Sequence, residues 1–188
     1  MIDQTTKPQP TFGVIGGGSW ATAIVKILCE TQECVGWYMR NTAAIEHITT
    51  ENHNPNYLSS VEFNTDQLLM SDDINEIVAC TQTIIFAIPS AFIESELQKI
   101  TVSLKNKGFF SAIKGIVPQS NLIVGEHLNS RYQIPMDCIG VVTGPCHAEE
   151  VALERLSYLT IACMDSARAI QLSNAMSCAY IKCTTSDD

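Results

Sequence analysis

The sequence is poor in positively charged side chains. It holds 11 Lys and Arg against 20 Asp and Glu, a formal net charge of −9, and the few cations form no cluster. Because nucleic-acid backbones and anionic membrane surfaces are bound by clustered Lys and Arg, this composition argues against either as the main partner. An anionic small molecule remains compatible with the sequence if a few cations and helix N-termini are concentrated in one cleft.

The sequence also lacks a long apolar run. No uninterrupted apolar stretch reaches the roughly 18 residues of a membrane-spanning helix. The first eleven residues are polar and contain no apolar segment of the kind found in a secretory signal. We interpret residues 1–11 as a loose leader, and we expect a cytoplasmic protein that does not insert into a membrane.

Cysteine is plentiful, but its spacing does not indicate a metal site. None of the eight cysteines forms a C-x-x-C pair. His147 and Glu149 match the H-x-E of zinc deaminases, yet the P-C-x-x-C that those enzymes also need is missing. Most cysteines lie in apolar runs, which favours buried, reduced thiols. His47 and His53 have no neighbouring metal ligands in the sequence, and we interpret both as solvated residues.

Strand and helix patterns alternate along the 188 residues, a length that fits one domain. Strands are predicted at residues 12–15, 34–39, 61–63, 83–88, 109–113, 139–143, 158–162 and 180–183. Helices are predicted over residues 21–28 and 42–48, from residues 71–73 onward, and over residues 91–104, 122–131 and 167–176. This alternation predicts an α/β fold, a Rossmann-type doubly wound, mostly parallel sheet with helices on both faces.

Residues 12–25 contain a glycine-rich turn between a predicted strand and a predicted helix. Gly16, Gly18 and Ala21 match the G-x-G-x-x-G/A pattern of dinucleotide-binding turns. Gly16 permits the tight turn, Gly18 lets a pyrophosphate approach the backbone, and Ala21 lets the helix pack close to the strand. Since the N–H groups at the helix start would face the phosphates, this turn predicts binding of NAD or NADP.

Other predicted strands end in residues suited to the same ligand, since an open α/β sheet binds ligands beyond its carboxyl ends. Arg40 closes the second strand, where an acid would bind the 2′-hydroxyl of NAD and an Arg can hold the 2′-phosphate of NADP. Asn41 follows it and can cap the next helix. Pro89, Lys114 and Gly144 end later strands. For Arg40 and Lys114 the alternative is a solvated surface residue.

Six segments in order resemble the successive motifs of bacterial NAD(P)-dependent glycerol-3-phosphate dehydrogenase. They are residues 16–23, 37–41, 54–58, 87–90, 112–116 and 144–151. The resemblance implies a chain whose residues 12–188 form the NAD(P)-binding domain. It also implies that the family's helical second domain, which carries the proton-transferring Lys, is absent from this sequence.

The resemblance also implies site residues. The cofactor-binding residues expected from the fingerprint, the strand ends and the resemblance are Gly16, Gly18, Ser19, Trp20, Ala21, Arg40, Asn41, Pro89, Lys114 and Ala148. The substrate-binding residues expected are Lys114, Gly144 and Cys146. Cys146 stands where the family usually has Ser or Thr, Ala21 where it usually has Gly, and His147 where an aromatic or apolar residue is usual. No catalytic residue is expected in this chain.

The implied activity is hydride transfer between sn-glycerol 3-phosphate and dihydroxyacetone phosphate, which supplies glycerol phosphate for phospholipid synthesis. We expect the 188-residue chain alone to be inactive and to self-associate, as a homodimer. Two alternatives stay open at this point. One is another two-domain dehydrogenase of the 3-hydroxyacid or ketopantoate reductase type, and the other is a non-catalytic dinucleotide-binding redox sensor.

Overall fold

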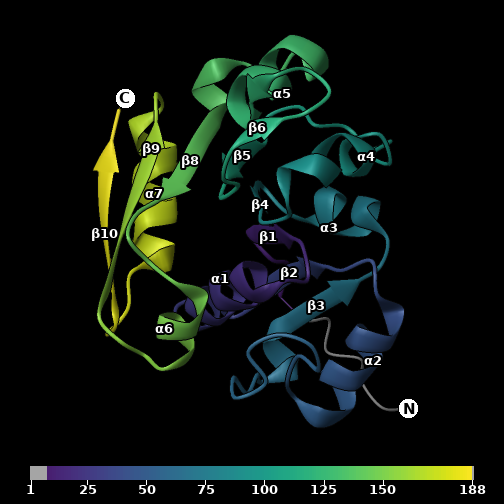
Figure 1. Ribbon diagram of the computed structural model, residues 1–188, viewed down its shortest axis with the longest axis vertical. Coiled ribbons are helices and arrows are strands. Elements are labelled where there is room, and N and C mark those ends of the chain that lie inside the picture. The colour runs from purple at the N-terminus through teal and green to yellow at the C-terminus, as the bar shows by residue number, and fades with distance from the viewer. Residues whose placement is uncertain (1–7, 188) are drawn as a thin grey trace.

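The computed structural model describes residues 8–187, which form a sheet flanked by helices (Figure 1). The strands of the large sheet are β1 (Phe12–Ile15), β2 (Val35–Tyr38), β3 (Leu68–Ser71), β4 (Thr83–Phe86), β5 (Gly108–Ser111), β8 (Ile139–Thr143), β9 (Ser157–Cys163) and β10 (Ile181–Ser186). The helices are α1 (Ser19–Cys29), α2 (Thr42–Glu51), α3 (Ile74–Cys80), α4 (Ile93–Leu97), α5 (Val124–Tyr132), α6 (Ala148–Ala152) and α7 (Ser166–Met176).

The sheet has the strand order β10-β9-β8-β5-β4-β1-β2-β3. Strands β1 to β5 and β8 are parallel, whereas β9 and β10 are parallel to each other and antiparallel to β8. The chain builds outward from β1 through β2 to β3 and then returns to place β4 on the other side of β1. The predicted Rossmann-type, mostly parallel sheet is therefore confirmed, and its topological switch point lies between β1 and β4.

Two apolar cores lie on the two faces of the sheet. Val14 and Ile85 contribute to the core beneath α1, α6 and α7, whereas Ile15 and Phe86 contribute to the core beneath α3, α4 and α5. Successive side chains of a strand point to opposite faces, so a strand buried on both sides must be apolar throughout. Ile84, Ile85 and Phe86 are fully buried, which is why β4 is a continuous apolar run in the sequence.

Three sequence predictions differ from the structure. The predicted strand at residues 61–63 is wrong. Val61 and Phe63 lie in a loop and their side chains are buried, and the strand of this region is β3, at Leu68–Ser71. The predicted helix over residues 91–104 is too long. Its first turn is a 3₁₀ helix, Ser90–Phe92, and α4 ends at Leu97, after which Asn75 Oδ1 accepts the N–H groups of Thr101 and Val102.

The third difference lies before α5. The predicted helix over residues 122–131 begins only at Val124, because Leu122–Ile123 (β7) pairs in antiparallel fashion with Ile116–Val117 (β6). The other predicted elements are confirmed to within a few residues. Residues 1–7 of the predicted leader lie outside the described residues, and the domain boundaries stay a prediction.

The cysteines and histidines can also be placed. None of the eight cysteines, all of which lie within residues 8–187, forms a disulfide. Within residues 8–187 no three metal-ligating side chains gather into one group, and no helix is long and apolar enough to cross a membrane. The interpretation of His47 and His53 as solvated is wrong, since both are half-buried and their Nε2 atoms lie 3.2 Å apart.

Candidate functional site

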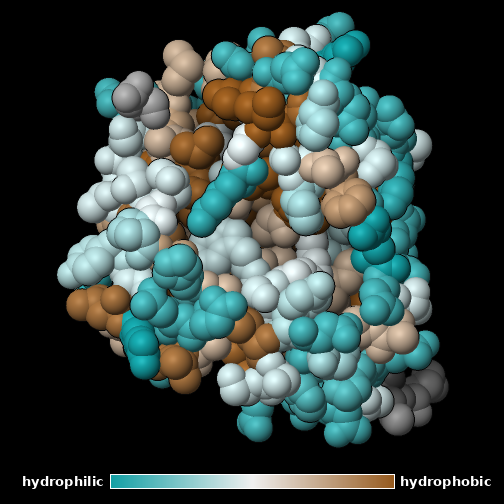
Figure 2. Space-filling model, viewed as in Figure 1, coloured by the Kyte–Doolittle hydropathy of each residue, from teal (hydrophilic) through white to brown (hydrophobic). Residues whose placement is uncertain are grey.

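A cleft runs along the carboxyl ends of the central strands, and Figure 2 shows the corresponding hollow near the centre of the molecular face. It consists of two adjoining cavities of about 500 and 830 Å³. Gly18, Ala87, Ile88 and Pro89 line both of them, at the ends of β1 and β4. The cleft therefore lies at the switch point, where a doubly wound sheet binds its ligands.

The glycine turn forms the floor of the first cavity. Gly16 has φ +138°, its N–H donates to the Tyr38 carbonyl at 3.0 Å, and its own carbonyl accepts the Trp37 indole N–H at 2.7 Å. The next helix, α1, begins at Ser19 with Gly18 as its N-cap. Since Gly18 has no side chain, the N–H groups of the first turn remain available for an anionic ligand.

Asn54 ties the following loop to this turn. Its side chain is buried and donates to the Gly17 carbonyl at 3.2 Å and to Thr22 Oγ1 at 3.0 Å. Its Oδ1 accepts the N–H groups of Asn56 and Tyr57, two residues that line the first cavity. Asn54 is a positioning residue that was not predicted from its own chemistry, although it lies in one of the family-like motifs.

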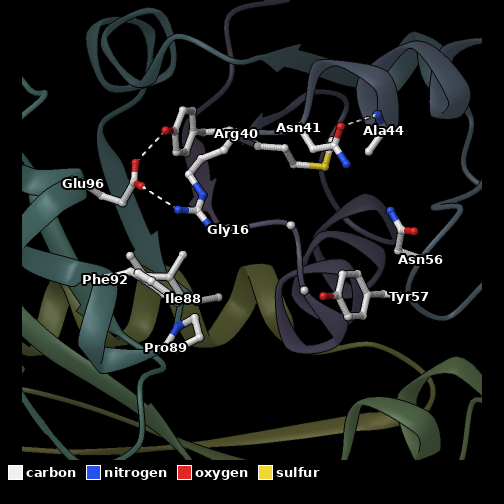
Figure 3. A pocket seen from close by; sticks show the side chains of 15 residues that line it. Gly16, Arg40, Asn41, Ala44, Asn56, Tyr57, Ile88, Pro89, Phe92 and Glu96 are labelled. Atoms are coloured by element: carbon white, nitrogen blue, oxygen red, sulfur yellow. Dashed lines mark hydrogen bonds and ion pairs between the residues drawn. The ribbon is translucent and has the colours of Figure 1, made fainter.

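Arg40 projects into the far end of the first cavity, as Figure 3 shows. Its guanidinium carbon lies 5.0 Å from the centroid of the Phe92 ring, and its Nη1 lies 3.8 Å from Glu96 Oε1. Asn41 accepts the N–H of Ala44 at 3.3 Å and so caps α2, as predicted, while also lining the cavity. Nothing in the sequence around Phe92 and Glu96 singled them out.

Glu96 is buried beneath this end of the cavity and accepts a hydrogen bond from the Tyr38 hydroxyl at 2.6 Å. Burial, followed by the hydrogen bond to Glu96, raises the pKa of Tyr38 above its usual range. Tyr38 therefore remains a protonated donor at neutral pH, and the carboxylate of Glu96 is fixed in place next to Arg40.

The second cavity brings together the residues predicted to contact the substrate and several of those predicted to contact the cofactor. Ser19, Trp20, Lys114, Gly144, Cys146 and Ala148 all line it. Lys114 is exposed after the end of β5. Cys146 is 7% exposed, and burial raises the pKa of its thiol, so this side chain presents a neutral, weak donor.

Ala21 is the one predicted site residue that does not line the cleft. It is fully buried in α1 and lines neither of the two cavities, which agrees with its predicted packing role. The others line one cavity or the other, and Gly18 and Pro89 line both. The structure thus brings strand ends from residues 16 to 148 to one cleft, while their contacts with ligands stay a prediction.

The parallel sheet, the glycine turn at its switch point and the cleft define a Rossmann-type domain of the class that binds dinucleotides. Residues 11–169 match the family model of the NAD-dependent glycerol-3-phosphate dehydrogenase N-terminus. The chain belongs to this family, which confirms the resemblance and disfavours the other two-domain dehydrogenases.

Several known proteins are similar to the chain. Glycerol-3-phosphate dehydrogenase [NAD(P)+] of Corynebacterium aurimucosum is 28% identical over 93% of the chain and 53% of its own length. The Pseudomonas aeruginosa protein of the same name is 32% identical over 91% of the chain and 49% of its own length. The chain therefore spans about half the length of these curated relatives.

Solved structures show the same fold. A glycerol-3-phosphate dehydrogenase of Plasmodium falciparum superposes with a TM-score of 0.83 at 20% identity, covering 95% of the chain and 53% of its own. The corresponding enzyme of Saccharomyces cerevisiae gives a TM-score of 0.80 at 21% identity, covering 95% and 56%. At such identities these superpositions support the fold alone.

Proposed function

We propose that this chain is the cofactor-binding half of an NAD(P)-dependent glycerol-3-phosphate dehydrogenase. The observation that carries the proposal is the continuous cleft between Arg40 and Lys114, with the open helix start of α1 at its middle. An adenosine 2′-phosphate would lie at Arg40, the pyrophosphate at Gly18, and the nicotinamide in the second cavity near Pro89.

When bound, the nicotinamide supplies the hydride that interconverts dihydroxyacetone phosphate and sn-glycerol 3-phosphate. The residues of this chain bind and orient. The N–H groups at the start of α1 and the ammonium of Lys114 offer positive charge to the anionic groups of cofactor and substrate. Gly144 and Cys146 border the same cavity and would contact the substrate, with the Cys146 thiol as a weak donor.

The proton-transferring Lys that the resemblance implies would come from the second half found in the relatives. The family resemblance supports three further proposals for the whole protein: a homodimeric assembly, a cytoplasmic location, and a supply of glycerol phosphate for phospholipid synthesis. A small phosphorylated metabolite is the substrate that the few cations of this acidic chain are placed to bind.

Replacing Arg40 tests the orientation of the cofactor. In Arg40→Ala we expect affinity for NADP+ to fall by about ten- to a hundredfold, because a charge-assisted phosphate contact contributes roughly 1.5–3 kcal/mol. Affinity for NAD+, which lacks the 2′-phosphate, should change by less than about threefold. Isothermal titration calorimetry measures both affinities. Arg131→Ala, on the exposed side of α5, is the matched control, and unchanged NADP+ binding in Arg40→Ala would contradict the assignment.

A further inference from the structure

Glu96 is a buried carboxylate at the adenosine end of the cleft. Its side chain is only 2% exposed although it lines the first cavity. It accepts the Tyr38 hydroxyl at 2.6 Å and the Lys99 ammonium at 2.8 Å, and its other oxygen lies 3.8 Å from Arg40. Figure 3 shows it pointing toward the Arg40 guanidinium. Because its oxygens are occupied by these donors, Glu96 would act on a ligand through its negative charge and not through a direct hydrogen bond.

Arg40, which follows β2 where the fingerprint acid is missing, thus has a carboxylate from α4 beside it. Arg40 and Lys99 are both largely exposed and share this single buried negative charge. A 2′-phosphate bound to Arg40 would experience both the attraction of the two cations and the repulsion of Glu96. A ribose 2′-hydroxyl carries no charge and would experience neither strongly.

We propose that Glu96 determines how strongly the site discriminates between NADP and NAD, by offsetting part of the positive charge of Arg40. This inference rests on the proposed function. Glu96 has two opposing effects on a 2′-phosphate, since it helps to orient Arg40 and it repels the phosphate. The 3.8 Å separation exceeds a hydrogen bond and Arg40 is 58% exposed, so the orienting effect is small. The repulsion comes from a buried charge that solvent screens weakly, and it is therefore the larger effect.

Glu96→Gln tests this directly. Glutamine keeps the size of the side chain and an acceptor for Tyr38, and it removes the charge. We expect NADP+ to bind about tenfold more tightly, with NAD+ within about twofold of the parent, as measured by calorimetry on the 188-residue chain. Glu94→Gln is the matched control, because Glu94 lies on the same helix but faces His127, with 2.7 Å between Oε2 and Nε2. It should leave the ratio of the two dissociation constants unchanged.

Lys99→Gln keeps the proposal testable if Glu96→Gln does not fold. Removing the ammonium leaves Glu96 less compensated, so NADP+ should bind about threefold more weakly and NAD+ should be unaffected. The inference is overturned if the ratio of the NADP+ and NAD+ dissociation constants equals that of the parent in both variants, or if Glu96→Gln binds NADP+ more weakly than the parent. A parent chain that binds neither nucleotide would instead contradict the proposed function, so the two failures are distinguishable.

Discussion

Gly16→Ala is expected to lower the free energy of unfolding by about 3 kcal/mol or more, because the new side chain is strained and overpacked at once. Gly16 has φ +138°, a conformation that residues with a Cβ rarely adopt. A Cβ there would lie 2.4 Å from the carbonyl oxygen and 2.9 Å from the carbonyl carbon of Ala87. Both are backbone atoms, so relief requires the ends of β1 and β4 to separate.

Gly18→Ala is the matched control for this experiment. A Cβ at Gly18 meets no atom within 4 Å, and the residue has φ −84°. We expect its stability to stay within about 1 kcal/mol of the parent, the cost of a poorer N-cap residue. Urea denaturation followed by circular dichroism measures both variants. Equal stability of Gly16→Ala and Gly18→Ala would show that the turn is not constrained by Ala87.

Lys114→Met should lower kcat/KM for dihydroxyacetone phosphate by about ten- to a hundredfold in a protein that joins this chain to the second half found in its relatives. The estimate corresponds to the loss of a charged hydrogen-bond partner, roughly 1.5–3 kcal/mol. Lys114 lines the second cavity just after β5. Methionine keeps much of the stem and removes only the charge, so the melting temperature should change little.

Lys105→Met controls for the removal of one positive charge. Lys105 is exposed and precedes β5, so it lies at the opposite end of the same strand from the cleft. Its replacement should leave steady-state kinetics within about twofold of the parent. If the kcat/KM of Lys114→Met also stayed within about twofold of the parent, Lys114 would be a surface residue and not part of the site.

Local signals made much of the fold predictable. The glycines after β1 and the apolar run of β4 each constrain a short segment without help from distant residues, and both predictions are confirmed. The end of α4 could not be predicted, because Leu97 is followed by residues that would continue a helix in isolation. The backbone after α4 is held by Asn75, which accepts the N–H of Thr101. Because the two residues are far apart in the sequence, local patterns do not predict this contact.

The candidate site divides in the same way. Arg40 and Lys114 could be found because strand ends are readable from the sequence, and parallel strands bring their carboxyl ends to one edge. Asn54 and Glu96 could not be assigned a role from their own chemistry. Both are buried only because the loop after α2 and helix α4 pack against the cleft, and a buried polar side chain is distinguished from a solvated one only by its partners.

The most direct test of the account is nucleotide binding by the 188-residue chain, followed residue by residue through its backbone amide NMR signals. Addition of NADP+ should shift the signals of the glycine turn, of Arg40 and of residues 112–115, which line the two adjoining cavities. In Gly18→Ala, whose Cβ would occupy the space predicted for the pyrophosphate, the affinity should fall at least about tenfold while the fold is retained. Shifts confined to residues outside the cleft, or no binding at millimolar NADP+ and NAD+, would contradict the claim that this cleft is a dinucleotide site.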